Sequence, residues 1–304
     1  LLSAQLNRLT RRLYVNGIDH PYRNLTKGQW LRGNLHTHTT NTDGKNRPQA
    51  VINKYATLNH DFLAISDHDI FTAGKEYRKW DDKGLIMMPG NEISANGPHI
   101  LHVAPDRFVE PLTPRQEVID RVAAGAGLAV IAHPNWQGEF DGTKITQMQE
   151  WVGYHGLEIY NGLLNRLLGS PYCTNKWDLL LSQGRRLWGF ANDDSHNDDD
   201  IGNGWNVVCA RERSVSGIRE ALKAGRFYAS SGVEISRIAV RGNRVTIETE
   251  NARRIVGVST LGRGVAIADD SAITLDMQEA WHYVRFECWG DGEQFAWTQP
   301  FWAK

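Results

Sequence analysis

The sequence has few cysteines, no long apolar run and almost no net charge. Its three cysteines, Cys173, Cys209 and Cys288, lie far apart, so they indicate neither a disulfide framework nor a thiolate zinc site. No apolar run approaches the roughly 20 residues that cross a bilayer. The formal charge of −1 lacks the basic excess that is typical of surfaces for nucleic acids or membranes. We therefore expect neither a nucleic-acid polymer nor a membrane as a partner.

The sequence also lacks an internal repeat, a low-complexity tract and an apolar signal-peptide core. Its first residues, LLSAQLNRLTRRLYV, are too polar for such a core. Leucines at helical spacing in residues 2–13 predict a short packing helix there. The expected location is cytoplasmic, but a removed targeting segment stays open because the first residue is Leu1 rather than Met.

Short apolar runs alternate with longer amphipathic segments from about residue 31 to residue 230. Strands are predicted at 62–66, 85–90, 128–133, 156–160, 186–191 and 205–210, and helices at 48–59, 114–124, 175–183 and 215–224. Repeated strand–helix units predict an α/β fold with a parallel sheet, open or closed into a barrel.

The pattern changes after Gly232. Strand-like alternation around a Gly242-Asn243 turn predicts antiparallel strands, and no strong helix pattern follows. Four tryptophans in this part either pack in a sandwich core or form a surface that stacks on sugars. We divide the chain into an N-terminal extension (1–30), a large α/β domain (31–230) and a small β domain (231–304).

Ionisable residues follow five of the apolar runs. They are His36 and His38, Asp67 and His68, Glu92, His133, and Asp193, Asp194 and His196. The loops at the C-terminal ends of parallel strands build the sites of α/β proteins, so these side chains are expected to meet. Sharing one site also offsets the cost of burying charged groups.

The spacing and the residue types predict metal binding. Residues i and i+2 of an extended chain point to the same side, so His36 and His38 can bind one ion together, as can Asp194 and His196. Imidazole and carboxylate groups suit zinc, manganese or iron as divalent ions. One ion would be over-supplied with ligands, so we expect two or three ions with a bridging carboxylate.

Several motifs carry a resemblance to a known family. The segments LHTHTTNTDG, AISDHD, GNEIS, PHILHV, AHPNW and ANDDSH occur in this order. In this combination the chain resembles the PHP (polymerase and histidinol phosphatase) family of metallohydrolases over about residues 31–230. The later segments GRFYASSG and FAWTQPFW resemble the branch that contains carbamate hydrolases, in which a small β domain follows the PHP domain.

This resemblance implies a distorted (β/α)7 barrel with up to three metal ions at the C-terminal ends of the strands, followed by a small antiparallel β domain. It implies that Glu92 bridges the first and second ions. The remaining ligands that it implies are His36, His38 and Asp194 for the first ion, His99 and His133 for the second, and Asp43, His68 and His196 for the third. The segment HILHV contains both His99 and His102, and the family pattern HILG aligns with His99. In NDDSH, the D-x-H spacing selects Asp194 over Asp193.

The expected activity is hydrolysis of a small phosphorylated substrate by a hydroxide that bridges two metal ions. We assign the catalytic roles to Glu92, Asp194 and His196. Arg166 is the expected anion clamp, because a guanidinium group matches phosphate in a bidentate way. Three further residues are expected to line the substrate pocket: Asn135, Trp136 and Asn161.

Two other functions stay open. The same metal centre could cleave a carbamate, an ester or an amide, and the sparse Arg and Lys near the motifs favour this alternative. The chain could also be a non-catalytic binding protein whose β domain recognises a glycan or a partner. Every expected ligand position is filled, which argues against a lost active site. The sequence does not indicate an oligomeric state.

Overall fold

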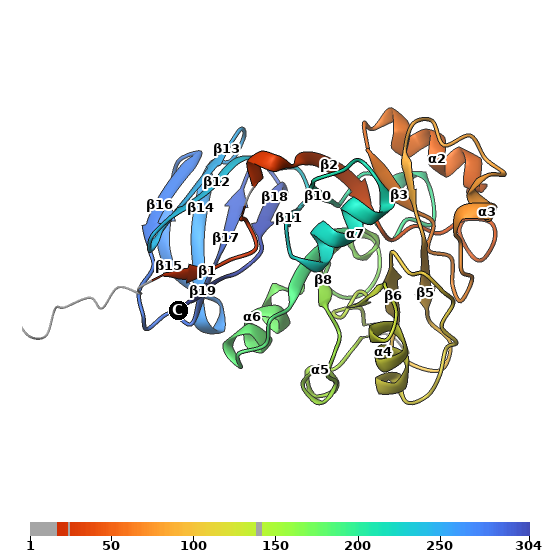
Figure 1. Cartoon of the computed structure of the whole chain (residues 1–304), viewed down its shortest axis with the longest axis horizontal. Helices are drawn as coiled ribbons and strands as arrows, with labels where there is room; N and C mark the ends of the chain where they lie inside the picture. The colour runs from red at the N-terminus through yellow and green to blue at the C-terminus, as the bar shows by residue number, and fades with distance from the viewer. Residues whose placement is uncertain (1–16, 24, 138–141) are drawn as a thin grey trace, which may run out of the picture.

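A computed structural model describes residues 17–23, 25–137 and 142–304 of the chain. Residues 29–230 form an α/β region that contains the six α-helices of the described chain, and residues 235–303 form a β region with the N-terminal strand β1 against it (Figure 1). The helices are α2 (Pro48–Thr57), α3 (Gly74–Tyr77), α4 (Arg115–Ala123), α5 (Ile145–Glu150), α6 (Thr174–Ser182) and α7 (Val215–Lys223). Four of them confirm the four predicted helices. The short 3-10 helices are η1 (Leu25–Lys27), η2 (Gly162–Asn165), η3 (Asp198–Asp200) and η4 (Thr260–Gly262).

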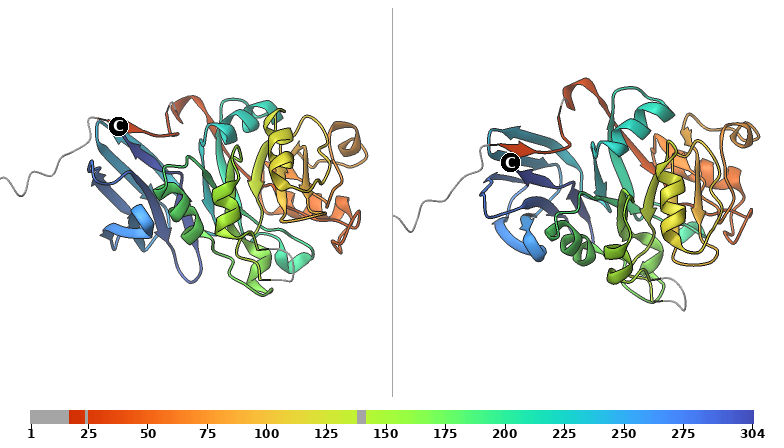
Figure 2. Two further views of the ribbon diagram at one scale, coloured as in Figure 1. Left: turned by 90° about the horizontal axis from the view of Figure 1, so that it is seen from below. Right: turned by 60° about the horizontal axis from the view of Figure 1, so that its bottom comes forward.

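One sheet of 11 strands runs through both regions. Figure 2 shows the two regions side by side in two further views. Its main order is β1-β19-β17-β18-β11-β10-β2-β3-β4, and β14 pairs with β17 and with β15. The α/β region supplies β2 (Gln29–Asn34), β3 (Phe62–Ala64), β4 (Ile86–Met88), β10 (Trp205–Ala210) and β11 (Phe227–Ser230). The remaining strands are β1 (Ile18–Asp19), β14 (Arg254–Ser259), β15 (Arg263–Ala268), β17 (Tyr283–Trp289), β18 (Phe295–Thr298) and β19 (Phe301–Ala303). Because β11 pairs with β18, backbone hydrogen bonds join the two regions.

A second sheet completes the α/β region. Its order is β5-β6-β7-β8-β9, with the bounds Gly90–Ile93, Ile100–Val103, Leu128–Ile131, Gly156–Asn161 and Trp188–Asn192. The strands β7, β8 and β9 are parallel, whereas β6 is antiparallel to both of its neighbours. The link between β5 and β6 is too short for a helical crossover, so these two strands must pair in opposite directions.

These pairings give a mixed α/β fold rather than a uniform series of parallel units. The predicted (β/α)7 barrel is not confirmed, because strand pairing is divided between two sheets and few helices cover them. Isolated bridges connect the two sheets at their ends: Thr37, after β2, pairs with Ser195, after β9, and His68, after β3, pairs with Glu92 on β5.

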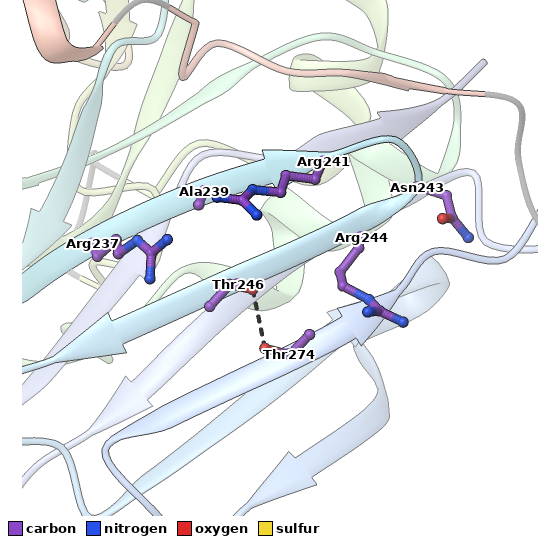
Figure 3. A pocket seen from close by; sticks show the side chains of 7 residues that line it. All are labelled: Arg237, Ala239, Arg241, Asn243, Arg244, Thr246 and Thr274. Carbon is purple, nitrogen blue, oxygen red and sulfur yellow. Dashed lines mark hydrogen bonds between the residues drawn. The ribbon is translucent and has the colours of Figure 1, made fainter.

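The β region adds a third, antiparallel sheet in the order β12-β13-β16, with the bounds Ile235–Arg241, Arg244–Thr249 and Ala272–Asp276. The β12–β13 turn lies at the predicted Gly242-Asn243 position. Figure 3 shows the outer face of this sheet, where Arg237, Arg241 and Arg244 surround a shallow hollow and Thr246 contacts Thr274. The inner face carries Ile238, Val245, Ile247 and Ile273 and packs in the core of the β region.

A buried ion pair lies where α6 meets the β region. Arg285 on β17 donates to both carboxylate oxygens of Asp178, at 2.7 and 2.6 Å, and to Glu287 at 2.8 Å. The Tyr283 hydroxyl also donates to Asp178, at 2.9 Å. Trp177 and Trp297 are buried nearby in a core shared by both regions. The two regions are therefore packed as well as hydrogen-bonded together.

Within the described residues, none of the helices has the length and apolar character to span a bilayer. The helix predicted for residues 2–13 lies outside the described residues.

Candidate metal centre

The nine predicted metal ligands come together at one end of the two sheets. His36 and His38 follow β2, His68 follows β3, and Asp194 and His196 follow β9. Glu92 lies within β5, His99 precedes β6, and His133 follows β7. Asp43 comes from the loop after His38. Each side chain of this set is linked to another by an N···O distance below 4 Å.

The innermost group is fully buried. The His36 Nε2 atom lies 3.3 Å from Glu92 Oε2 and 3.2 Å from Asp194 Oδ1. The His38 Nε2 atom lies 3.3 and 3.1 Å from the same two oxygens. Two imidazole nitrogens and two carboxylate oxygens thus converge on one point, and His36, His38 and Asp194 form a group that could hold a metal ion.

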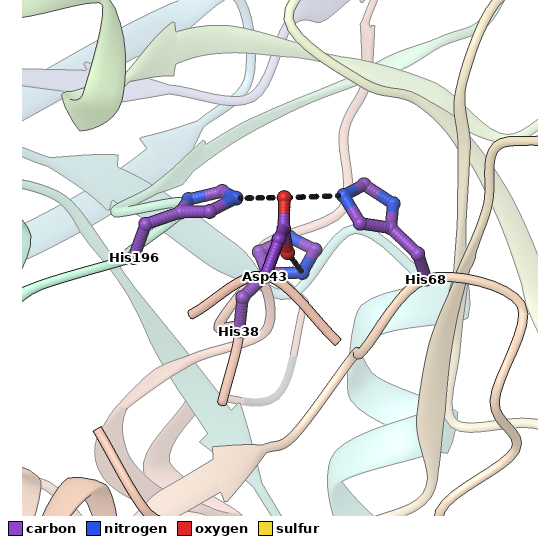
Figure 4. Close-up of side chains that lie close together, drawn as sticks. All are labelled: His38, Asp43, His68 and His196. Carbon is purple, nitrogen blue, oxygen red and sulfur yellow. Dashed lines mark ion pairs between the residues drawn. The ribbon is translucent and has the colours of Figure 1, made fainter. Parts of the chain in front are cut away.

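A second group opens to solvent. Figure 4 shows Asp43 between His68 and His196, with His38 beside them. Asp43 Oδ2 lies 3.2 Å from His196 Nε2 and 3.4 Å from His68 Nε2. The Asp43 side chain is 53% exposed, so this group is the one that solvent and small molecules can reach.

Glu92 connects the inner group to a third group. Its Oε1 atom lies 2.9 Å from His99 Nδ1 and 3.0 Å from His133 Nε2, while Oε2 lies 3.0 Å from His68 Nδ1. His68 therefore contacts both the Glu92 and the Asp43 groups. His102 lies apart from the cluster and packs against Gly127.

The tautomers of two ligands can be read from their partners. His36 Nδ1 lies 2.8 Å from Glu158 Oε1, and His196 Nδ1 lies 2.9 Å from the Asp194 carbonyl oxygen. Both partners accept hydrogen bonds, so in the neutral rings Nδ1 carries the proton and Nε2 presents its lone pair to the cluster. That is the arrangement a metal-binding histidine needs.

The buried carboxylates of the cluster also favour the binding of a cation. Burial disfavours the charged forms of Glu92 and Asp194, but the surrounding histidines outweigh it and hold the pKa of both carboxyls well below its usual range. Burial likewise opposes a charge on His36, yet Asp194, Glu158 and Glu92 raise its pKa well above normal. Within the described residues, Glu92 Oε2, Asp194 Oδ1 and His38 Nε2 have no hydrogen-bond partner. Divalent ions would balance these carboxylates and ligate these atoms, so the residues fit a metal centre.

Sequence reasoning missed Glu158, which lies on β8 behind the ligands. Its Oε1 atom accepts hydrogen bonds from His36 and Asn192, and its Oε2 atom accepts from the His133 backbone at 2.8 Å. The side chain is 1% exposed, yet every acceptor position is used. A carboxylate in the middle of an otherwise apolar strand was the available signal.

Two neighbouring carboxylates, of Asp67 and Asp193, accept hydrogen bonds from the loops around the cluster. Asp67 accepts from the backbone and hydroxyl of Thr39, at 2.7 and 2.8 Å. Asp193 accepts from the backbone of Gly202, Asn203 and Gly204. A Cβ atom on Gly44 would lie 2.6 Å from the His38 carbonyl group, so only glycine allows the Asp43 loop to approach this closely.

The backbone is strained at two ligands. Asp194 has φ of +53° and His133 has φ of +29°, a region that residues other than glycine rarely adopt. Each such residue costs on the order of 1–3 kcal/mol, and such positions cluster at functional sites.

A polar clamp holds the loop that precedes His99. The guanidinium group of Arg115, at the start of α4, donates to the carbonyls of Ser94, Ala95, Gly97 and Pro98 at 2.7–2.8 Å. From the other side, Asp69 accepts from the backbone of Ser94 and Ala95, each at 3.0 Å. Arg115 is only 4% exposed. This clamp fixes the chain that brings His99 to Glu92.

The predicted substrate residues have different surroundings. Arg166 donates to both oxygens of Asp200, at 2.6 and 2.9 Å. Asn161 donates to Glu158 and Asp194, so it orients a ligand. Asn135 donates to the Tyr172 carbonyl and to Asn175. Trp136 stands edge-on to His133, with ring centroids 5.0 Å apart.

A pocket of about 320 Å³ opens over the cluster. Its lining consists of seven of the nine predicted ligands, all but His36 and His38, together with Lys45, Trp136, Leu163, Arg166 and Leu167. Lys45 and the two leucines were not predicted. A lysine one residue after the TDG segment was the only signal for Lys45.

Comparison with solved structures identifies the fold. A two-domain protein from Bacteroides vulgatus that contains a predicted PHP-like metal-dependent phosphoesterase superposes on 90% of this chain and 94% of its own, with a TM-score of 0.52 and 17% identity. The chain has a PHP-like fold. The resemblance to PHP proteins is thus confirmed at the level of the fold.

Two further structures align with parts of the chain. A proposed metal-dependent phosphoesterase from Bifidobacterium adolescentis covers 64% of this chain and 96% of its own at 17% identity, with a TM-score of 0.45. An amidohydrolase from Chromobacterium violaceum covers 54% and 87% at 16% identity, with a TM-score of 0.40. No protein-family model and no curated protein matches the sequence.

Proposed function

We propose that this protein is a metal-dependent hydrolase that cleaves a phosphate ester of a small molecule. The observation that carries the proposal is the position of Glu92, whose two oxygens lie within 3.3 Å of nitrogen atoms from five histidines: His36, His38, His68, His99 and His133. A buried carboxylate with this surrounding is suited to bridge two ions.

Two or three divalent ions would be held by the nine ligands, with zinc, manganese and iron as the candidates. Ions bound here would lower the pKa of a coordinated water and offset negative charge on substrate oxygens. Asp194 would hold the inner ion with His36 and His38, and Glu158 would keep His36 in the metal-binding tautomer. His196 and Asp43, on the open side, would face the substrate.

The pocket supports a small substrate. Its volume of about 320 Å³ is at the lower end of the range for small-molecule sites. With the near-neutral charge of the chain, this argues against a nucleic-acid polymer as substrate. We further propose that the two sheets of the α/β region act as a distorted PHP-type barrel, and that residues 1–30, 31–230 and 231–304 are an extension, a catalytic domain and a β domain.

One observation favours a second candidate function. Three residues of the pocket lining are apolar, Trp136, Leu163 and Leu167, and such a lining also suits a neutral carbamate, ester or amide. The third candidate, a non-catalytic binding protein, would not need the strained Asp194 and His133 that the centre contains.

The test is elemental analysis of protein purified without chelators, together with hydrolysis of 4-nitrophenyl phosphate and 4-nitrophenyl acetate by the same preparation. We expect two to three metal ions per chain and cleavage of the phosphate. Metal with activity on the acetate alone would replace the proposal with the ester, carbamate or amide hydrolase. Less than one ion per chain would overturn the metal-dependent function.

A further inference from the structure

We infer that the substrate is a phosphate ester with a flat, ring-bearing leaving group, which packs on an apolar wall at Trp136, and that the Lys45 ammonium group binds its phosphoryl oxygens. This inference rests on the proposed function and names its substrate class. Its basis is the lining of the pocket, which combines three apolar residues with two basic ones.

The apolar residues of the lining are Trp136, Leu163 and Leu167. The indole ring stands at 88° to the His133 ring and at 76° to the His99 ring, with centroids 5.0 and 6.3 Å away. It therefore lies beside the third ligand group, within reach of the atoms next to a bound phosphoryl group. An aromatic ring partly open to a pocket is a contact surface for another ring.

This wall is formed before any substrate binds. The Gln137 backbone donates to the Leu168 carbonyl at 3.0 Å, and Ser170 donates to the Asn135 carbonyl at 3.3 Å. These bonds join the loop that carries Trp136 to the loop that carries Leu163 and Leu167. Gly169 makes the contact possible, since a Cβ there would lie 2.4 Å from the Asn135 carbonyl oxygen.

The pocket lining contains two basic residues, Lys45 and Arg166, which differ in whether an acidic residue balances their charge. Arg166 is bound in a bidentate way by Asp200, and Asp200 also accepts from the backbone of His196 and Asn197. Arg166 thus supports the His196 loop, and its charge is balanced. Lys45 lines the same pocket, and among the described residues its ammonium group has no hydrogen-bond or ion-pair partner.

The backbone places Lys45 beside the open group of ligands. Its N–H donates to the His196 carbonyl at 2.7 Å, and it follows Asp43 by two residues. A lysine ammonium is a mobile point charge that suits phosphoryl oxygens. Lys45, rather than Arg166, is therefore the residue that we assign to anion binding.

The apolar wall at Trp136 and the Lys45 ammonium group should have separable effects on ligand affinity. Phenylphosphonate and methylphosphonate are matched probes, because neither can be hydrolysed and only one carries a ring. Isothermal titration of the metal-loaded protein should give a Kd for phenylphosphonate about tenfold lower than for methylphosphonate, as expected for an aromatic contact plus burial of the ring. Trp136→Ala should remove most of this ratio, and Trp136→Phe should keep it.

Lys45→Met should weaken both probes equally, by about tenfold, because it removes a charge-assisted contact to the phosphonate group and leaves the ring contact. Lys45→Arg should restore most of the affinity. Lys79→Met and Trp289→Ala, at exposed positions away from the pocket, are the matched controls and should change neither Kd.

The outcomes distinguish this inference from the proposed function. Equal affinities for the two probes in the wild type, or a Trp136→Ala loss shared by both probes, would overturn the ring-bearing substrate. An unchanged affinity in Lys45→Met would overturn the anion site. If the probes bind as expected but no phosphate ester is cleaved, the pocket assignment holds and the phosphoesterase activity does not.

Discussion

The α/β region and the β region treat their charged residues in opposite ways. The α/β region buries Glu92, Glu158 and Asp194 among histidines and leaves several of these polar atoms without hydrogen bonds. The β region has an apolar core and places its ion pairs on the surface, such as Arg237 with Glu248. Within its described residues, only Thr260 Oγ1 and Trp302 Nε1 are buried without a partner.

The difference indicates that the α/β region carries the candidate site, whereas the β region has a structural role. Unpaired buried polar atoms lower the free energy of unfolding unless a ligand binds them. The α/β region is therefore less stable than an apolar core would make it, and this cost is concentrated at the candidate site. The β region carries less of this cost, with two such atoms among its described residues, and it extends the large sheet through the pairing of β11 with β18. Arg285 is its exception, because this buried guanidinium group pairs with Asp178 of the α/β region.

The largest expected effect comes from Glu92→Gln. The amide cannot bridge two cations as a carboxylate does, so the variant should lose at least one metal ion. Its activity should fall by more than about 100-fold, which exceeds the loss that follows when a hydrogen-bond partner of a metal ligand is removed. Elemental analysis and steady-state kinetics would measure this. The matched control is Glu248→Gln in the β region, which should change neither. Full metal content and turnover in Glu92→Gln would refute the model of the centre.

Arg285→Met tests the buried ion pair between Arg285 of the β region and Asp178 of the α/β region. Removing one partner of a buried ion pair leaves Asp178 charged and unpaired, which should cost about 3–5 kcal/mol in the free energy of unfolding. Urea denaturation would give this value, and the metal content of the folded fraction should be unchanged. Arg253→Met removes an exposed pair with Asp291 and should leave the free energy of unfolding almost unchanged, because solvent screens an exposed pair. Similar losses in the two variants would show that the buried pair is not special.

Arg115→Met tests whether the clamp acts on metal binding. Without the guanidinium group, the loop before His99 loses four carbonyl contacts, and metal affinity should fall by about 10- to 100-fold. Competition with a chelator measures the affinity, and added metal should restore activity if positioning is the role. Arg121→Met, on the exposed side of the same helix, is the control. An activity loss that excess metal cannot restore would exclude this role.

A smaller effect concerns acid stability. His155 Nδ1 accepts the Ala129 N–H at 3.2 Å, and burial, with Lys223 nearby, lowers the pKa of His155 to about 4. Since the unfolded histidine titrates near 6.5, the unfolded state binds the proton first, and the free energy of unfolding should fall as pH drops from 6.5 towards 4. The slope is at most about 1.4 kcal/mol per pH unit.

Urea denaturation at pH 7 and pH 5 measures this effect. The fall in stability between the two pH values should be smaller in His155→Gln than in the wild type, because glutamine has no proton to bind. An identical fall in both proteins would assign the acid sensitivity to other histidines.

The sequence allowed much of the centre to be predicted, because strand ends and short motifs are local features. His36, His38 and Asp194 are examples, and their positions follow from where β2 and β9 stop. Arg166 shows the limit of such reasoning. Its partner Asp200 lies 34 residues away, and no local pattern reveals that the charge is already balanced.

The strand topology was harder to predict than the elements themselves. The four helices were located correctly, yet the antiparallel β6 and the β11–β18 pairing were not foreseen. Strand direction depends on which distant strand is available as a neighbour, and alternating or apolar patterns do not encode that choice.

The large sheet has a consequence for the order of events during synthesis. β11 pairs with β18, and β1 pairs with β19, which comes last among the described strands. While a ribosome is still adding residues 295–303, β11 has an open edge and β1 has no neighbour, although all nine ligands have already emerged. Folding that waits for such distant contacts is slow and leaves strand edges free to associate with other chains. Metal that reaches the early ligands during this interval would meet a region whose sheet is not yet complete.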